Sequence, residues 1–510
     1  MVRHRGRHSR GASVVAETSD AGSVAGPDPG LSGANAMAGT RAGGSLATIV
    51  EETPEAESTP VPASDPVPVS RLVPVILSPP LSDSAVGAPM SEARSLATAP
   101  ATELFVEPHR HRRRWPWAVL VVIVAVVVAA SVQLGRPFPA VAMHRALPGT
   151  SPVPGATPAL PWPVVGEAAV AIPQLGVTVQ SGPEAAVPIA SLTKIMTGYL
   201  TLRAHPLAPD DQGPVLTMTA ADQAEASAEE GAGATNVPVQ PGEQLTERQL
   251  LNGLLVHSAN NLADVLALWD AGSLPAFVTK MNTTAAALGM AHTHYADASG
   301  LDPATAGTAS DELLVTQAAM AIPTFAAVVA QRAVTLPIAG VLPSYVSSVG
   351  TDGVVGVKSG FTDAAMGCMV LAGERTVAGQ RVQVLAAVTG QPGEDPLNVA
   401  DGVDEHLLDA VVAGLREVPV TPAGARVGEV TMAWSHQKVA VVAARAISLL
   451  AWPGQQPSLA LAHRPLRSGL HAGTAVGTLG ASIGRERVVV PVHVVDSLGG
   501  PSLSWRLKRS

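Results

Sequence analysis

The sequence has a single cysteine, few aromatic residues and few lysines, and each shortage limits the kinds of site or core that the chain can form. One cysteine, Cys368, excludes an intramolecular disulfide framework and a zinc site built on cysteines. Its apolar neighbours predict that it is a buried strand residue. Aromatic residues make up 3% of the 510 positions and hydrophobic residues 47%, so a large core is possible but must consist mainly of Val, Ala and Leu. No long basic stretch lies outside the first third of the chain, which argues against nucleic acid as a partner.

The first part of the chain lacks any sustained apolar periodicity. Residues 1–109 are rich in Pro, Ser, Gly and Ala, and segments such as Pro60-Val-Pro62 cannot hold a helix or a central strand. Such a composition cannot bury enough apolar surface to offset the entropy of ordering. We therefore predict that residues 1–114 form a disordered tail.

Residues 115–135 are predicted to cross a membrane as a helix. Four arginines between positions 110 and 114 precede Trp115-Pro-Trp117 and an apolar run, and no charged residue occurs before Arg136. A helix of these 21 residues would be about 31 Å long, close to the thickness of a bilayer core. The arginines on its N-terminal side predict that residues 1–114 are cytoplasmic and that the rest of the chain after the helix is outside.

Three further regions follow the apolar run. Residues 136–163 contain eight prolines and are predicted to be a stiff linker. Residues 164–415 alternate between helical and strand patterns, which indicates an α/β or α+β domain. Residues 416–510 consist of short Val-rich runs separated by Gly, which is typical of a small all-β domain. Within the middle region we predict helices at 191–203, 246–256, 262–269 and 274–288, the second with a capping box at Thr246 and Gln249, and strands at 367–373 and 381–389.

Ser191-Leu-Thr-Lys194 is the first motif that carries chemistry. Residues three apart share a face of a helix, so the serine hydroxyl would lie against the lysine amine. A lysine accepts a proton only when it is neutral, which burial or a neighbouring cation achieves by lowering its pKa. The same two-residue pattern occurs again at Ser435-His-Gln-Lys438, so by itself it indicates little. Ser191 follows Pro188 at the entry to an apolar helix, whereas Ser435 lies in the Val-rich tail.

Two later motifs support a functional role for Ser191-Leu-Thr-Lys194. Ser258-Ala-Asn260 occurs at the predicted break between two helices, where it could relay a proton and hold a substrate amide, or simply cap a helix. His257 beside it is predicted to be structural. Lys358-Ser-Gly360 precedes a predicted strand and offers a cation, a hydroxyl and room for a substrate backbone, although a solvated lysine in a turn would look the same. With only five lysines in the chain, two of them within ordered motifs indicate a site.

This ordered set resembles the low-molecular-weight penicillin-binding proteins of the D-alanyl-D-alanine carboxypeptidase family. That family carries S-L-T-K, S-G-N or S-A-N, and D-G-x-K-T-G-[YF]-T, and class A β-lactamases carry the related set S-x-x-K, S-D-N and K-T-G. Residues 352–362 are similar to the third motif, with a longer gap after Asp-Gly and with Ser359 in place of the commoner Thr. The stretch from Phe277 to Tyr295 and Ser299-Gly-Leu-Asp302 also resemble the family. The resemblance spans about residues 165–415.

The resemblance implies a fold, a mechanism and partners. The fold would be a serine β-lactamase/DD-peptidase-like α/β (α+β) domain, followed by a small all-β domain. The enzyme would remove the terminal D-alanine of peptidoglycan stem peptides through an acyl-enzyme, with β-lactam antibiotics as covalent inhibitors and with no metal or cofactor. The implied catalytic residues are Ser191, Lys194, Ser258 and Asn260, and the implied substrate-binding residues are Lys358, Ser359, Gly360 and Phe361.

Two other functions stay open at this point. A β-lactamase is disfavoured because Ala259 stands where Asp would occupy the second motif. A catalytically idle penicillin- or peptidoglycan-binding module is disfavoured because the motif set is intact. The resemblance also implies a single-pass protein of a bacterial cell membrane, anchored here by its N-terminal helix, whereas the family often anchors through a C-terminal amphipathic helix.

Overall fold

The structure is a computed structural model that describes residues 115–231 and 234–509. The disordered tail predicted for residues 1–114 lies outside these ranges. The first described element, α1, runs from Trp115 to Gly135 with no buried residue, as predicted from the uncharged run. In the described part of the chain it is the one unbroken helix that is long and apolar enough to cross a membrane.

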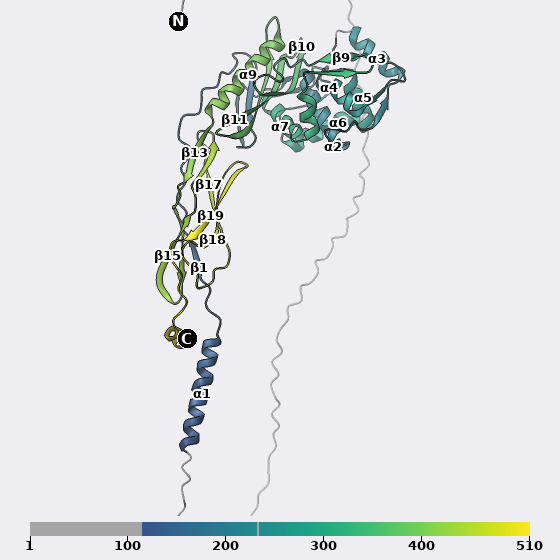
Figure 1. The fold of residues 1–510 in the computed structure, drawn as a ribbon. Coiled ribbons are helices and arrows are strands. Elements are labelled where there is room, and N and C mark those ends of the chain that lie inside the picture. Colours follow the sequence, from purple (N-terminus) through teal and green to yellow (C-terminus); the bar gives the residue numbers. More distant parts are fainter. Residues whose placement is uncertain (1–114, 232–233, 510) are drawn as a thin grey trace, which may run out of the picture. The chain divides into compact units, whose positions relative to one another are not determined.

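An antiparallel sheet of five strands organises the region that follows, in the order β10-β11-β12-β2-β3 (Figure 1). Its strands are β2 (Glu167–Ile172), β3 (Val177–Ser181), β10 (Val354–Thr362), β11 (Met366–Val377) and β12 (Gln380–Gln391). Cys368 is fully buried on β11, as predicted. The β11–β12 hairpin turns at Gly379, whose φ of +80° suits glycine. The sheet leaves β10 as an edge strand.

Helices cover the sheet and build a separate layer next to β10. They are α2 (Thr193–Ala204), α3 (Ala220–Gly231), α4 (Glu247–Leu255), α5 (Asn260–Ala271), α6 (Leu274–Leu288), α7 (Ala309–Met320), α8 (Pro323–Val329) and α9 (Pro396–Gly414). The predicted capping box is present: Thr246 accepts from the Gln249 backbone N–H, and the Gln249 side chain accepts from the Thr246 N–H. The predicted helices at 191–203, 262–269 and 274–288 correspond to α2, α5 and α6.

Two apolar cores hold these layers. One contains Leu192, Ile195 and Met196 of the Ser191 helical segment together with leucines of α4 and α5 and the inner face of the sheet. The other contains the opposite sheet face and α9, and continues into the C-terminal strands. Three short ladders complete the region: β4 (Val187–Pro188) with β7 (Ala306–Gly307), β5 (Val215–Thr217) with β6 (Gln244–Thr246), and β8 (Ala333–Leu336) with β9 (Gly340–Pro343). Because α2 is buried on nearly all sides, its first turn is held rigidly against the sheet.

The C-terminal region is all-β, as predicted, apart from a short final helix. Its six-stranded sheet begins with β1 (Ala142–Arg145) and has the order β1-β14-β15-β19-β18-β17, and a second ladder pairs β13 with β16. The elements are β13 (Arg416–Thr421), β14 (Arg426–Met432), β15 (Ser435–Ala443), β16 (Ile447–Ala451), β17 (Ser458–His463), β18 (Ala475–Ile483), β19 (Glu486–Val494) and α10 (Leu503–Lys508).

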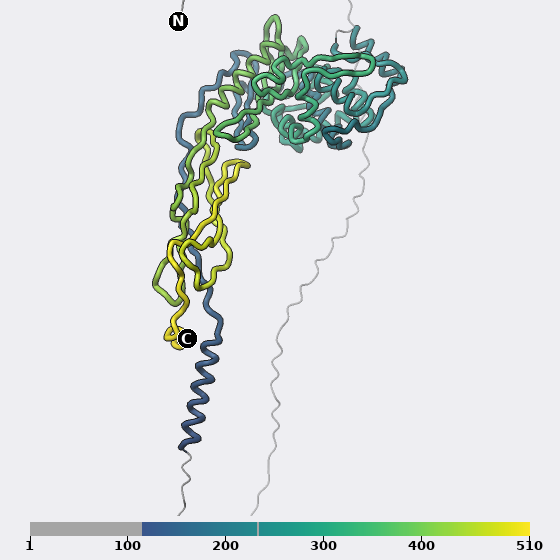
Figure 2. The backbone as a smooth tube through the Cα atoms, viewed as in Figure 1, coloured from purple at the N-terminus to yellow at the C-terminus, as the bar shows by residue number. Residues whose placement is uncertain are grey.

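The segment between α1 and β2 differs from the expected stiff linker. Residues 142–145 form β1, which pairs with β14 as an edge strand of the C-terminal sheet. Figure 2 shows this blue stretch of chain among the green and yellow strands. Val141 also bridges Leu466, and Val153 exchanges backbone hydrogen bonds with Gly454 and Gln455. The prolines exclude a central strand, but the gap between Pro139 and Pro148 leaves room for an edge strand.

Candidate active site

Ser191 lies on a short 3₁₀ turn, η1 (Ala190–Leu192), that leads directly into α2. Ala190 before it has a φ of +46°, a left-handed conformation that is unusual for alanine. The Thr193 hydroxyl donates to the Ala190 carbonyl at 2.7 Å and holds this turn. Leu192 and Ile195 anchor the same turn in the core. The backbone therefore presents Ser191 at a tight, pre-formed corner, at a cost of roughly 1–3 kcal/mol for the strained residue.

Lys194 is fully buried one helical turn away, as its spacing from Ser191 predicts. Its Nζ lies 2.8 Å from Ser191 Oγ, 2.6 Å from Asn260 Oδ1 and 2.7 Å from the Ser299 carbonyl oxygen. Two of these partners are carbonyl oxygens, which can only accept. A neutral amine that donates one N–H to each of them has its lone pair left for the Ser191 hydroxyl, which then donates to it. The three contacts thus hold the Lys194 amine in the orientation that a base for the Ser191 hydroxyl would need.

Burial also gives Lys194 the pKa that a base requires. Removal from water lowers its pKa from 10.5 to about 7, while the carboxylates of Asp297, Glu229 and Asp264 act in the opposite direction. A value near 7 means that a large share of Lys194 is neutral at physiological pH. The sequence predicted the contact with Ser191, and the structure adds the desolvation that makes the amine basic in the useful range.

Ser258 and Asn260 lie where α4 gives way to α5, as predicted. Ser258 has a φ of +67°, a second left-handed residue at the site. Asn260 begins α5 and contributes the amide oxygen that accepts from Lys194. His257 has a structural role, as predicted, because its Nδ1 lies 3.0 Å from the Pro343 carbonyl and its ring stacks on Tyr345. The Ser258-Ala-Asn260 corner therefore brings a hydroxyl and an amide to Ser191 and Lys194.

The third motif lies on the edge strand β10. Gly360 packs against the turn that carries Ser191: a Cβ at this position would come within 2.9 Å of the Ser191 backbone nitrogen. Ser359 and Phe361 line the cavity, and Phe361 is 46% exposed. A β-bulge between Val354 and Val357 takes up part of the longer gap after Asp-Gly.

Lys358 is placed differently from its neighbours on β10. It is 1% exposed, is not among the residues that line the cavity, and donates to the Ser359 carbonyl at 2.8 Å. Burial, and then the nearby Lys194, lower its pKa well below 10.5. Its amine is therefore buried outside the lining of the cavity and interacts electrostatically with Lys194.

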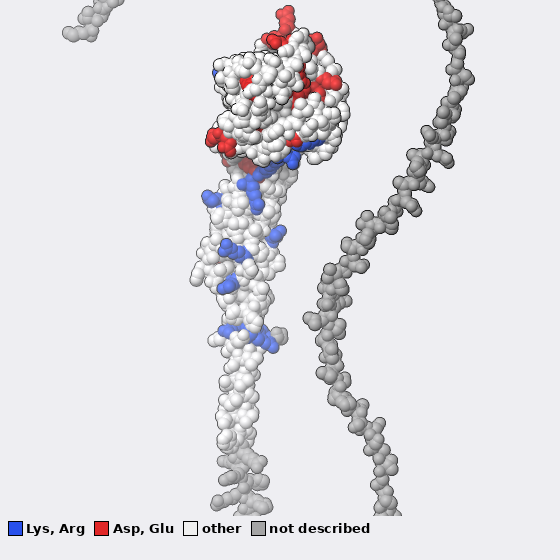
Figure 3. All heavy atoms as spheres, turned by 90° about the vertical axis from the view of Figure 1, so that its right-hand side faces the viewer, with Lys and Arg blue, Asp and Glu red and all other residues white. Residues whose placement is uncertain are grey.

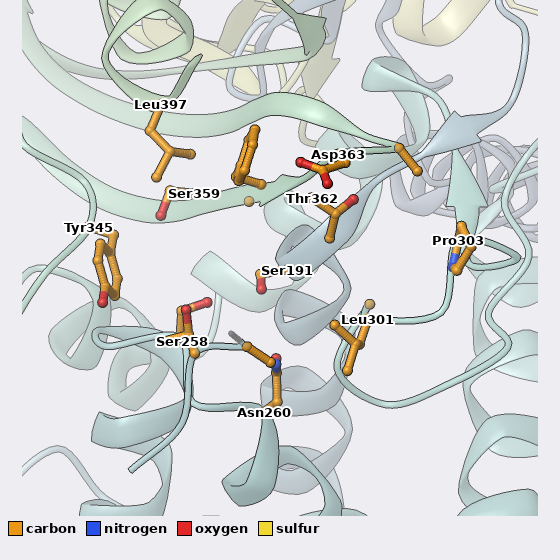
Figure 4. Close-up of a pocket in the computed structure, with 16 residues that line it drawn as sticks. Ser191, Ser258, Asn260, Leu301, Pro303, Tyr345, Ser359, Thr362, Asp363 and Leu397 are labelled. Carbon is orange, nitrogen blue, oxygen red and sulfur yellow. The ribbon is translucent and has the colours of Figure 1, made fainter. Parts of the chain in front are cut away.

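A cavity of about 480 Å³ opens in front of these groups (Figure 4). Ser191 lies at its centre, with Ser258 and Asn260 on one side and Ser359 on the β10 side. Its walls also contain residues to which the sequence assigned no role, namely Thr235, Gly300, Leu301, Pro303, Tyr345, Thr362, Asp363 and Leu397. Thr362 ends β10 and Leu397 lies in the first turn of α9, and the other six come from loops. Only the family-like Ser299-Gly-Leu-Asp302 stretch and the end of the third motif could have signalled part of this wall.

The second Ser-x-x-Lys copy does not form a comparable pair. Ser435 and Lys438 lie on strand β15 rather than on a helix. Lys438 is exposed and pairs with Glu429 at 3.1 Å. The β geometry separates two residues that a helix would have brought onto one face, so the copy at Ser191 alone combines a helical turn with a buried lysine.

Comparison with known proteins agrees with this geometry. Residues 175–392 match the sequence model of a peptidase family described as D-alanyl-D-alanine carboxypeptidase. The chain is 34% identical over 216 residues to D-alanyl-D-alanine carboxypeptidase DacB2 of Mycobacterium tuberculosis. This match spans 40% of this chain and 67% of the relative. It is 35% identical over 129 residues to a D-alanyl-D-alanine endopeptidase of Pseudomonas aeruginosa, where the match spans 25% of this chain and 38% of the relative.

A solved structure also aligns with this chain. Penicillin binding protein 5 from Haemophilus influenzae superposes with a TM-score of 0.48 at 20% identity, over 68% of this chain and all of that one. The matched sequence segment contains Ser191, Lys194, Ser258, Asn260 and Lys358, and the mycobacterial relative is matched over two thirds of its length. The chain therefore belongs to the D-alanyl-D-alanine carboxypeptidase family.

Proposed function

We propose that this protein is a serine-type carboxypeptidase that removes the terminal D-alanine from peptidoglycan stem peptides. The observation that carries the proposal is the Ser191–Lys194 pair: a hydroxyl at the floor of an open cavity, 2.8 Å from a buried amine whose pKa is about 7. A nucleophile next to a base that a third group orients is the arrangement used for acyl transfer. Family membership supplies the substrate class.

Acylation begins when Ser191 Oγ attacks the carbonyl carbon between the last two D-alanines. The proton of the hydroxyl passes to Lys194, and the C–O bond forms. The backbone N–H groups of Ser191 and Phe361 are the proposed donors to the oxyanion, each worth about 3 kcal/mol. Ser258 passes a proton, supplied by Lys194, to the amine of the departing D-alanine as the C–N bond breaks. Asn260 keeps the amine of Lys194 aligned through its 2.6 Å contact.

Deacylation and substrate binding use the same groups. Water attacks the Ser191 ester and gives a proton to Lys194. Lys194 returns this proton to Ser191 Oγ as the ester C–O bond breaks and the shortened peptide leaves. We propose that Ser359 contacts the terminal carboxylate of the substrate and that Lys358 attracts it from beneath the strand. An arriving carboxylate favours the protonated form of Lys358 and would strengthen this attraction. Gly360 leaves room for the peptide backbone along β10.

The proposed cellular arrangement is a single-pass bacterial membrane protein with a cytoplasmic N-terminus. Residues 115–135 would span the bilayer and residues 164–415 would form the catalytic domain. Residues 136–163 would connect these two parts and contribute β1 to the β domain, which residues 416–510 complete. Charge supports this order, since acidic side chains concentrate on the catalytic region and basic ones on the C-terminal β region (Figure 3). Basic residues favour the neighbourhood of an anionic membrane surface.

Release of D-alanine from a stem pentapeptide tests the function. The full-length protein in detergent should release one D-alanine per peptide, and Ser191→Ala should release none. Covalent labelling by penicillin without any release would show an idle binding module. Hydrolysis of a penicillin at a rate far above that of the peptide would show a β-lactamase.

A further inference from the structure

The loop from Asp297 to Asp302 forms the wall of the site behind Lys194. We propose that Asp297 is a positioning residue of the reaction, which holds the Ser299 carbonyl on the Lys194 amine and sets the pH at which that amine becomes a base. The inference rests on the proposed function, because it concerns the base of that reaction. The family resemblance assigns no role to this carboxylate.

Asp297 organises the loop through both of its oxygens. Oδ2 accepts from the Ser299 hydroxyl and the Leu301 backbone N–H, each at 2.8 Å, and Oδ1 accepts from the Thr305 hydroxyl at 2.5 Å. A carboxylate that accepts several hydrogen bonds is held in one orientation. The loop is thereby closed into a turn whose geometry depends on this one side chain.

The turn is pressed directly against the nucleophile. Gly300 has a φ of +82°, and a Cβ there would come within 1.8 Å of the Ala190 carbonyl oxygen, so no other residue fits. On one side of Gly300 the Ser299 carbonyl accepts from Lys194 at 2.7 Å. On the other side Leu301 enters the cavity wall. A movement of the turn would thus change the Lys194 contact and the cavity together.

The charge of Asp297 also acts on Lys194. Among the carboxylates that oppose the desolvation of the amine, Asp297 has the largest effect, ahead of Glu229 on α3 and Asp264 on α5. Burial raises the pKa of Glu229 to about 7 and that of Asp264 to about 8, so near neutral pH these two are partly or mostly protonated. Lys358 on β10 is the neighbouring amine, and its pKa is lowered in part by Lys194. Of the three carboxylates, Asp297 therefore has the strongest electrostatic effect on the base.

The test is the pH profile of acylation by a penicillin, measured on the full-length protein with Asp297→Asn. Asparagine keeps an acceptor for the loop but removes the charge, so the pKa of Lys194 should fall. The acid limb of the profile, which is the pH range where the acylation rate rises, should therefore move to lower pH by roughly 0.5–1 unit. The matched control is Asp302→Asn, an exposed acid of the same loop, which should leave the limb unchanged. Thr305→Val is a second variant, which removes one anchor of Asp297 while keeping the charge, and should slow acylation without moving the limb.

The outcomes separate the possibilities. A limb that stays at the wild-type pH in Asp297→Asn, whatever the rate, would overturn the electrostatic role. An equal shift in Asp302→Asn would show a general charge effect and would also overturn it. If Asp297→Asn does not fold, Thr305→Val decides: an unchanged acylation rate would remove the positioning role. Because a penicillin acylates Ser191 without any release of D-alanine, these results stand even if the protein releases no D-alanine from a peptide.

Discussion

The most informative perturbation of this site is a change in pH, because the proposed base is a lysine. With an ordinary pKa of 10.5, roughly 1 in 3,000 lysines is neutral at pH 7. The buried environment of Lys194 lowers its pKa to about 7, which makes about half of it neutral. The difference of about 3.5 units corresponds to roughly 5 kcal/mol of preference for the neutral form. Acylation should therefore rise about tenfold between pH 6 and pH 8 and then level off.

The assay is the second-order rate constant for acylation by a fluorescent penicillin between pH 5.5 and 9, at constant ionic strength. Lys194→Arg is the comparison, because arginine stays protonated and cannot act as a base. It should acylate at a rate too low to measure across the range. A rate constant that is flat from pH 6 to pH 8, or that still rises steeply at pH 9, would refute the assignment. Substantial acylation of the arginine variant would refute it as well.

Three further predictions concern other parts of the protein. Amidation of the substrate's terminal carboxylate should reduce kcat/KM by about 10–100-fold in the wild type. Lys358→Ala should be slow on both the free acid and the amide, with nearly equal kcat/KM for the two. If the variant still prefers the free acid, Lys358 acts on the pKa of Lys194 and not on the substrate carboxylate. Glu312 is fully buried, and burial raises its pKa from 4.5 to about 8. As pH rises, Glu312 therefore loses its proton at lower pH in the unfolded chain than in the folded protein. The free energy of unfolding consequently falls between about pH 4.5 and pH 8. Glu312→Leu should therefore gain stability over wild type across that window, by roughly 1.4 kcal/mol per pH unit at most, whereas a difference in urea midpoint that is constant between pH 5 and 8 would contradict this. Protease added to intact spheroplasts should digest the catalytic domain and spare residues 1–114, and protection of the catalytic domain would reverse the proposed orientation.

Elements with a strong local signal were predictable from the sequence. The capping box of Thr246 and Gln249 is a local hydrogen-bonding pattern, and it forms as expected. The helix at Trp115–Gly135 follows from an uncharged, apolar run whose length as a helix matches a bilayer core. The difference between Ser191 and Ser435 was also visible, because only the first precedes a helical pattern, and β15 indeed places the second on a strand.

Features that depend on contacts distant in sequence were not predictable in this way. β1 pairs with β14 nearly 300 residues later, and no local pattern shows that a proline-rich segment will become an edge strand. The Ser299 carbonyl reaches Lys194 across 105 residues through its backbone, which carries no residue-specific signal. The burial of Lys358 was missed for a related reason: its motif indicates a site, whereas its depth depends on how β10 packs.

Ser191, and no other serine, should become acylated by a penicillin. Mass spectrometry of a digest of the treated full-length protein locates the adduct. We expect one adduct per chain on the peptide that contains Ser191, none in Ser191→Ala, and an unchanged adduct in Ser435→Ala. An adduct of undiminished yield in Ser191→Ala, or one lost in Ser435→Ala instead, would contradict this expectation.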